Sequence, residues 1–333
     1  MTKRMSRRWA LKAGAVAAAL PAMPAIVRAQ DKLTLKMGTL GSTQYFYYKG
    51  AVRMAEEVAK KTGDKVTIQV FPNQQLGNER DMIEGMQLGT IDLAIINTPL
   101  LASFDARFQI FDMPFMFNDW AHVNRMVSGQ IGQGLLKSLE SKNLKGLAYS
   151  TAGHRHVLNY KRPIKTPDDM KGLKIRVLDN PVHVAIVNAM GANATPMQYS
   201  EVATALRQRT VDGLDSPTAA VVTEKFYETQ KFMSLTGHVF TGVVYIIGMK
   251  RYQSLSPELQ KVFLEAGKVG ADLETEQHNK AEVDGIDLLR KLHGMTIDTV
   301  DKGPFRARMQ PVLDRFQDRV GKDLIETVRK MGG

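Results

Sequence analysis

Leu33-Thr34-Leu35-Lys36-Met37-Gly38 opens the part of the chain that predicts the fold class. Its apolar residues alternate with polar ones, as in a half-buried strand, and Lys65 to Val70 repeats that alternation. Thr90 to Ile96 predicts a third strand, because its apolar run suits a buried parallel position. Between the strands we expect an amphipathic helix over about 45–61 and a second helix that is capped by Asn78 and runs to about Leu88. This order of strands and helices is typical of an α/β lobe.

The rest of the chain continues in the same class. Further strands are predicted over Leu144–Thr151, Val157–Tyr160 and Lys174–Val177, with two strand-like stretches between Gln230 and Ile247. Ser256-Pro257-Glu258 is a strong helix start, and the helix that follows, to about His293, is long enough to cross between two lobes. About 300 mature residues also favour two lobes over one. We interpret the phenylalanine-rich region 104–118 as core packing, with a pocket wall as the alternative.

The N-terminus has the pattern of a targeting segment. Ser6-Arg7-Arg8 resembles the start of a twin-arginine signal, an apolar run covers Ala13 to Ala25, and Val27-x-Ala29 fits a cleavage site. The alternative is a transmembrane anchor, but the run is shorter than the about 20 residues that a bilayer needs, and prolines interrupt it. We therefore predict that residues 1–29 form a signal peptide that is cleaved near Ala29, and that the mature protein is periplasmic.

Composition narrows the possible functions. The chain carries 45 basic and 34 acidic residues, and six of the basic ones lie in residues 1–29, which leaves 39 basic against 34 acidic residues in the mature protein. No run of basic residues is long enough to read as a nucleic-acid patch, so we expect no nucleic-acid partner. The sequence contains no cysteine, which excludes disulfides, thiolate metal sites and cysteine nucleophiles.

The sequence carries none of the familiar catalytic motifs. It has no Gly-x-Ser-x-Gly elbow, no Walker loop and no His-Glu-x-x-His, and Gly129, Gly132 and Gly134 do not form a dinucleotide fingerprint. His154 and His156 have the spacing of metal ligands on a strand, but Arg155 between them argues against a cation. We therefore expect no cofactor, no metal and no catalytic residue.

Two arginines form the strongest binding signal. Arg176 ends the strand in Asp168-Asp169-Met170-Lys171-Gly172-Leu173-Lys174-Ile175-Arg176-Val177, and Arg155 begins another strand. A lone arginine usually forms a surface ion pair, but these two stand among apolar and small residues, where an unpaired charge is costly. On adjacent parallel strands, both guanidinium groups would face the crevice where open α/β sheets bind ligands. Their partner would be Asp215, a ligand carboxylate held by paired hydrogen bonds, or both.

Several segments together resemble the solute receptors of tripartite ATP-independent periplasmic (TRAP) transporters, the DctP family. The segments that carry the resemblance, over nearly the whole mature chain, are Gln75–Arg80, Gly89–Asp92, Asn159–Ile164, Lys171–Val177, Thr195–Met197 with Ser200–Val202, and Val211–Gly213. The resemblance implies a periplasmic-binding-protein-like fold: two α/β lobes around a ligand cleft that closes on a carboxylate. It implies lobe I over 30–152 plus 242–281 and lobe II over 153–241 plus 282–333, with the long helix crossing both.

The resemblance also assigns roles to site residues. By position, Arg176 matches the family's principal carboxylate-binding arginine and Arg155 its second ligand-facing arginine. Glu79 and Asn97 would hydrogen-bond hydroxyl groups from lobe I, and Tyr199 would pack on the carbon face of the ligand. Asp215 would hold Arg176 in its working orientation. Asp179 and Ser216 also fall where family members contact the ligand.

Departures from the sialic-acid branch of the family at Asn97, Leu100 and Ser216 disfavour a sialic acid. A sugar acid, either a hexuronate such as glucuronate or galacturonate or an aldonate, fits best, and a C4-dicarboxylate or keto acid is the alternative. We expect a monomer that delivers its organic acid to membrane permease subunits. Two other classes stay open: a periplasmic sugar-acid enzyme with Glu79 or His154 as base, and a ligand-sensing partner of a signalling receptor.

Overall fold

A single mixed sheet organises the part of the chain that this computed structural model describes, residues 32–332. Its strand order is β2-β1-β3-β8-β4-β7-β5-β6, and β9 pairs with β8. The strands are β1 (Leu33–Gly38), β2 (Val66–Phe71), β3 (Leu93–Asn97), β4 (Leu144–Asn159), β5 (Lys174–Val177), β6 (Asn193–Pro196), β7 (Gly213–Pro217), β8 (Phe232–Gly248) and β9 (Thr296–Asp298). The predicted signal peptide, residues 1–29, lies outside the described residues.

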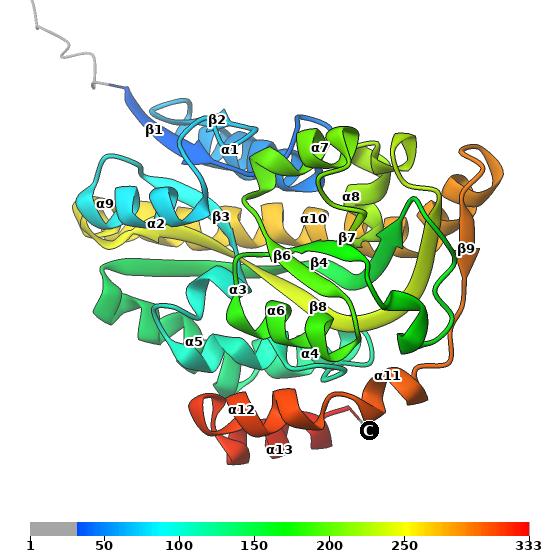
Figure 1. The fold of residues 1–333 in the computed structure, drawn as a ribbon. Coiled ribbons are helices and arrows are strands. Elements are labelled where there is room, and N and C mark those ends of the chain that lie inside the picture. The colour runs from blue at the N-terminus through cyan, green and yellow to red at the C-terminus, as the bar shows by residue number, and fades with distance from the viewer. Residues whose placement is uncertain (1–31, 333) are drawn as a thin grey trace, which may run out of the picture. The chain divides into compact units, whose positions relative to one another are not determined.

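Helices cover both faces of the sheet (Figure 1). They are α1 (Phe46–Thr62), α2 (Glu79–Leu88), α3 (Thr98–Leu101), α4 (Trp120–Ser128), α5 (Gln130–Ser138), α6 (Pro181–Ala189), α7 (Tyr199–Gln208), α8 (Thr218–Thr223), α9 (Met249–Ser254), α10 (Pro257–Lys291), α11 (Gly303–Ala307), α12 (Gln310–Val320) and α13 (Lys322–Lys330). Short 3-10 turns are η1 (Ala106–Asp112), η2 (Leu139–Lys142), η3 (Pro167–Met170) and η4 (Phe226–Glu228). None of the helices within residues 32–332 is both long and apolar enough to span a membrane.

The two halves of the sheet are joined by its two longest strands. β1 runs parallel to β2 and β3 at one end, and β5 runs parallel to β6 and β7 at the other. Between these ends lie β4 and β8, which pair antiparallel along most of their length. β8 also pairs with β3 and β4 with β7, so each long strand belongs to both halves. This is the predicted two-lobe α/β architecture; the predicted lobe bounds stay a prediction.

The two long strands correct the sequence analysis, which divided each of them. The prediction separated 144–151 from 157–160, whereas β4 continues through Gly153 with changes of register between Thr151 and Gly153 and between Arg155 and Val157. Gly153 has φ of +88°, which glycine adopts without a steric penalty. The extra residues of such bulges bend a strand without ending it, because its partner continues alongside.

Alternate residues of β8 enter separate apolar cores on the two faces of the sheet. Val244 and Ile246 pack with α2, α4, α5, α6 and α12, whereas Val243, Tyr245 and Ile247 pack with α1, α7, α8 and α10. Phe108, Phe111 and Phe117 from the phenylalanine-rich region are buried in the first core, which confirms the interpretation as core packing.

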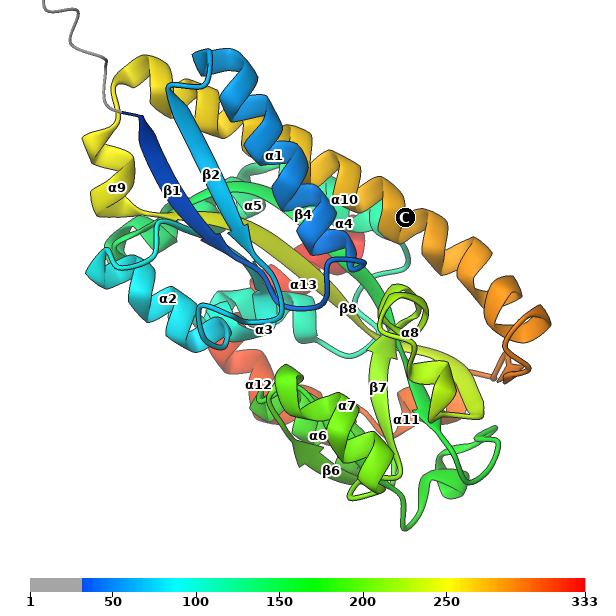
Figure 2. The same ribbon diagram turned by 90° about the horizontal axis from the view of Figure 1, so that it is seen from above.

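The predicted helix starts are confirmed. Asn78 accepts a hydrogen bond from the backbone N–H of Asp81, and Ser256 accepts one from that of Leu259. The long helix α10 lies beside α1 and reaches α8 and β9, so it passes along both halves of the sheet (Figure 2). A β-carbon added to Gly270 of α10 would lie 2.5 Å from the carbonyl oxygen of Gly50 in α1, which shows how closely the two backbones approach.

Candidate ligand-binding site

One cleft brings together seven of the eight predicted site residues. Its lining includes Glu79 at the start of α2, Asn97 at the end of β3, Arg155 of β4, Arg176 of β5, Asp179, Tyr199 at the start of α7, and Ser216 of β7. These residues come from both ends of the sheet, where strands end and helices begin. The eighth residue, Asp215, is fully buried behind the cleft wall.

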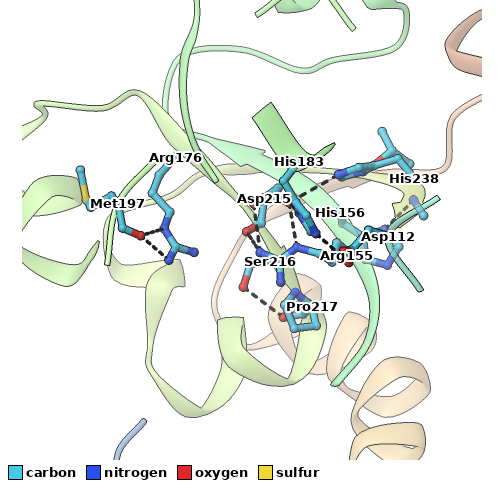
Figure 3. Close-up of polar contacts among 12 residues, drawn as sticks. Asp112, Arg155, His156, Arg176, His183, Met197, Asp215, Ser216, Pro217 and His238 are labelled. Carbon is cyan, nitrogen blue, oxygen red and sulfur yellow. Dashed lines mark hydrogen bonds and ion pairs between the residues drawn. The ribbon is translucent and has the colours of Figure 1, made fainter. Parts of the chain in front are cut away.

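Arg155 forms the tightest ion pair in the site (Figure 3). Its Nε donates to Asp215 Oδ2 at 2.7 Å, and its NH2 group donates to Asp215 Oδ1 at 3.0 Å and to the Asp215 carbonyl at 2.6 Å. Burial opposes ionisation of the Asp215 carboxyl, but the Arg155 guanidinium and two nearby histidines, His183 and His238, hold its pKa well below the usual range. The charge of Arg155 is therefore already balanced by protein.

Two predictions about the arginines are wrong. We expected β4 and β5 to be adjacent and parallel, but β7 lies between them and β4 is antiparallel to β7. We also expected Asp215 to orient Arg176, whereas Asp215 binds Arg155. Asp215 acts on Arg176 only through space, where its negative charge favours the charged guanidinium.

Arg176 lacks an anionic partner within residues 32–332. Its Nε and NH2 groups both donate to the carbonyl oxygen of Met197, at 3.2 Å and 2.8 Å, and its guanidinium lies 5.9 Å from the ring centroid of Tyr199. The residue is only 4 % exposed. Burial and the nearby charge of Arg155 lower its pKa to about 10, so it stays cationic at neutral pH. Of its five N–H donors, those on the second terminal nitrogen are free for a ligand.

On the other side of the cleft, Glu79 and Asn97 bind each other. Glu79 Oε1 accepts from the Asn97 backbone N–H at 2.6 Å and from its side-chain amide at 3.1 Å. Asn97 Oδ1 accepts from the Tyr47 hydroxyl at 2.6 Å. Burial raises the pKa of Glu79 to about 7, although the Asn97 hydrogen bonds and both arginines oppose that shift. A carboxyl with this pKa exchanges readily between accepting and donating, which suits recognition of a hydroxyl group.

The remaining predicted residues differ in how many of their hydrogen-bonding groups have partners. The hydroxyl of Tyr199 is buried without a hydrogen-bond partner in the described part of the chain. Ser216 makes only a long contact, 3.4 Å, to the carbonyl of Pro217. Asp179 is exposed at the rim. Tyr199 and Ser216 are therefore the polar groups with most capacity left for a ligand.

An aromatic wall at the start of α1 was not predicted from the sequence. Tyr45 and Tyr47 line the cleft, their ring centroids are 4.7 Å apart, and Tyr45 stacks on Tyr199 at 6.5 Å. The cluster Tyr45-Phe46-Tyr47-Tyr48 was visible in the sequence, but its helical spacing favoured an ordinary core face. The carbonyl of Met197, the only hydrogen-bond acceptor that Arg176 finds in residues 32–332, left no signal in side-chain patterns.

The two histidines that flank Arg155 face away from the cleft. His154 Nδ1 lies 2.7 Å from Glu282 Oε1 of α10, and the ring of His156 accepts from the backbone N–H of Gly237 at 3.1 Å. Consecutive residues of a strand point to opposite faces, so the position of Arg155 directs both rings away from a bound solute. His154 is therefore out of reach as a base for a ligand in the cleft. Within residues 32–332, no cluster of three or more potential metal-ligating side chains occurs.

A cleft between the halves of an α/β sheet, with a buried cation that has no anionic partner among residues 32–332, is typical of a two-lobe solute-binding protein for anions. A family model described as "Bacterial extracellular solute-binding protein, family 7" matches residues 37–319, and the chain belongs to this family, the DctP-type solute receptors of TRAP transporters. These receptors are periplasmic, bind small organic acids, work with membrane permeases and are not enzymes.

Three relatives illustrate the similarity. The 2,3-diketo-L-gulonate-binding periplasmic protein YiaO of Escherichia coli is 34 % identical over 302 residues, which cover 89 % of this chain and 91 % of the relative. A TRAP solute-binding protein of Polaromonas, with D-erythronate bound, is 38 % identical with a TM-score of 0.86, covering 89 % and 98 % of the two chains. A TRAP solute-binding protein of Bordetella, with density assigned to pantoate, is 36 % identical with a TM-score of 0.87, covering 90 % and 100 %.

Proposed function

We propose that this TRAP receptor binds a hydroxylated monocarboxylate, most simply a sugar acid such as an aldonate or hexuronate, and that Arg176 anchors its carboxylate. The observation that carries the proposal is the buried guanidinium of Arg176, which makes hydrogen bonds only to the Met197 carbonyl among the described residues. An unpaired buried cation is costly, and a ligand carboxylate that accepts two parallel hydrogen bonds would offset that cost.

Charge balance supports one carboxylate rather than two. The cations in the cleft lining are Arg155 and Arg176, and Asp215 already neutralises Arg155. A second ligand carboxylate would therefore meet no free cation, and Glu79 would repel it. Desolvating a charge without a partner is unfavourable, so a C4-dicarboxylate fits this lining less well than a monocarboxylate.

The other polar groups of the cleft lining favour hydroxyl groups on the rest of the ligand. Glu79 and Asn97 offer acceptors and donors from lobe I, and the free hydroxyls of Tyr199 and Ser216 offer more from the other side. Three of the similar proteins support this class, because diketogulonate, erythronate and pantoate are monocarboxylates with hydroxyl groups, whereas other relatives bind C4-dicarboxylates. A keto acid is the second candidate, which the diketogulonate ligand of the Escherichia coli relative favours.

Delivery and export complete the proposal. We expect the ligand to bridge both lobes, to stabilise the closed cleft through its higher affinity for that state, and so to present a closed monomeric receptor to the permease. Residues 1–29 would act as the twin-arginine signal peptide, with cleavage near Ala29 releasing the mature protein into the periplasm. Mass spectrometry of the protein secreted into the periplasm tests this cleavage, and a retained N-terminus would contradict it.

The test of the ligand class is a thermal-shift screen over aldonates, hexuronates, keto acids and C4-dicarboxylates, followed by titration calorimetry of the hits. A ligand at about 100 times its dissociation constant adds roughly 2.7 kcal/mol of stability, so a true hit is visible. We expect hits among the hydroxylated monocarboxylates. Binding confined to C4-dicarboxylates would overturn the charge-balance reasoning.

The test of Arg176 is calorimetry of Arg176→Ala with the best hit. Loss of a desolvated charge pair costs about 2–5 kcal/mol, which weakens binding by at least about thirtyfold. The ligand-free variant should keep its thermal stability, because no ion pair is broken. Arg207→Ala, at an exposed position of α7, is the control and should bind normally. Unchanged affinity in Arg176→Ala would refute the assigned role.

A further inference from the structure

A row of buried ionisable groups continues from Arg155 away from the ligand cleft (Figure 3). Asp215 of β7, which binds Arg155, also lies 3.5 Å from Nδ1 of His183 in α6. The other ring nitrogen of His183, Nε2, lies 3.3 Å from Oδ1 of Asp112 at the end of η1. The side chains of Asp112, His183 and Asp215 are at most 1 % exposed, and Asp112 and His183 do not line the cleft.

The two carboxylates that flank His183 favour a protonated ring. Each of its nitrogens faces a carboxylate, and a neutral ring would turn a lone pair toward one of them. Burial opposes the charge, but Asp112 and Asp215 together raise the pKa of His183 above its ordinary value. Burial also raises the pKa of Asp112, against the opposing effects of His183 and Arg155. With His183 protonated and both carboxyls ionised, the two negative charges are balanced by His183 and Arg155.

Two other polar residues, His238 and Asn180, lie beside this row. His238 of β8 lies 3.6 Å from Asp215 Oδ2, but burial lowers its pKa, and its Nδ1 pairs with the Thr236 hydroxyl at 2.8 Å. Asn180 donates to Asp112 Oδ2 at 3.3 Å and to the Pro99 carbonyl at 2.9 Å, and so fixes the far end. His183 is therefore the group whose protonation sets the charge balance of the row.

We propose that His183 and Asp112 are positioning residues for ligand binding: the charged His183 ring, held between two buried carboxylates, fixes Asp215 and through it the Arg155 guanidinium in the cleft. The proposal rests on the proposed function and adds to it that Arg155, which lines the cleft together with Arg176, also contacts the bound anion. When His183 loses its proton, Asp215 loses one of its two cationic neighbours and draws more strongly on Arg155. Ligand affinity then falls, although no cleft residue has changed its charge.

The consequence is a pH dependence with a definite sign. Glu79 in the cleft, with a pKa of about 7, adds its own pH dependence, which the wild type and the variants share. Beyond that shared part, affinity should decline as pH rises through the titration of the His183 ring. Asp112→Asn removes one of the two carboxylates that hold the proton, so the decline should begin at lower pH. His183→Gln carries no charge and donates to only one neighbour, so affinity should be about tenfold weaker at neutral pH and should lose this dependence.

The experiment measures D-erythronate binding by calorimetry from about pH 5.5 to pH 9 for the wild type and both variants. His154→Gln is the matched control, because it removes an ionisable ring next to Arg155 on β4 that pairs with Glu282 outside the cleft. The control should keep the wild-type affinity and pH profile. A wild-type profile that His183→Gln and Asp112→Asn leave unshifted would overturn the proposal.

A second measurement needs no ligand and separates this proposal from the proposed function. Nitrogen-15 NMR of the ligand-free wild type follows the His183 ring and the Arg155 Nε–H, which donates to Asp215. We expect the Arg155 signal to shift in step with the His183 titration, and at lower pH in Asp112→Asn. An Arg155 signal that ignores this titration refutes the positioning role. A failure of D-erythronate to bind, with the coupled NMR shift present, would instead count against the proposed ligand class.

Discussion

Replacing Asp215 with asparagine should destabilise the protein far more than the same replacement at the surface. Arg155 Nε and Asp215 Oδ2 are 2.7 Å apart with side chains 6 % and 0 % exposed. Lys268 Nζ and Asp272 Oδ2 are 2.6 Å apart with side chains 71 % and 62 % exposed. The two pairs match in distance and differ in burial, so Asp215→Asn and Asp272→Asn form a controlled comparison.

The expected magnitudes follow from solvation. Removing one partner of a buried ion pair leaves an uncompensated charge and costs about 3–5 kcal/mol. An exposed pair four residues apart on a helix contributes about 0.3–0.5 kcal/mol. Because a folded domain is stable by only about 5–15 kcal/mol, Asp215→Asn should use a large part of that margin.

Urea unfolding, followed by far-ultraviolet circular dichroism, measures both changes on ligand-free protein. We expect a much lower midpoint for Asp215→Asn and a midpoint within error of wild type for Asp272→Asn. If the two variants differ by less than about 1 kcal/mol, burial does not govern the strength of these pairs and the account of Arg155 is wrong.

Two further predictions concern α10 and the helices around it. Burial raises the pKa of Glu274 to about 8, even though the Tyr245 hydroxyl donates to it at 2.6 Å. The folded state therefore keeps a proton that the unfolded state releases above about pH 4.5. For this reason the stability of the protein falls as pH rises from about 4.5 to 8. Glu274→Gln should remove this pH dependence and raise the free energy of unfolding by about 3–5 kcal/mol at pH 8. Urea unfolding at pH 5 and pH 8 measures the effect, and an equal loss of stability between the two pH values in the variant would contradict it. Gly50→Ala should destabilise by about 1–3 kcal/mol, because its β-carbon would collide with the Tyr245 hydroxyl and lie 3.0 Å from the Gly270 carbonyl. Gly134→Ala in α5 is the control, because no atom lies within 4 Å of the added carbon, and it should be neutral or slightly stabilising. Thermal melts of both variants measure the two effects, and equal losses of stability would contradict the packing account.

Local patterns in the sequence were enough to predict most helices and strands and the α/β fold class. Alternation predicted β1 and β2, and the caps Asn78 and Ser256 predicted where α2 and α10 begin, because these signals depend on neighbours in the chain. The strand break expected at Gly153 was wrong because a glycine that permits a bulge and a glycine that ends a strand look alike in sequence. Only the partner strand β8, which continues past it, distinguishes the two.

The sequence was enough to predict which residues line the site, but not which of them form ion pairs with each other. Family resemblance identified seven residues that line one cleft. It assigned Asp215 to the wrong arginine, because nothing local indicates that β7 lies between β4 and β5. His183 went unnoticed for a related reason: it sits in an apolar helical segment, and its two carboxylate partners are 71 and 32 positions away in sequence.

The pairing of β3 with β8 also governs how the chain can fold. Their paired residues are between 146 positions apart (Asn97 and Val243) and 154 positions apart (Leu93 and Ile247). During synthesis, one edge of β3 therefore stays unpaired until β8 has been made. Contacts between residues so far apart in sequence also slow folding. A cut between Ala152 and Gly153 would leave each fragment without strands that its own half of the sheet needs. Because the predicted lobes share β4 and β8, we expect them to fold as a single unit.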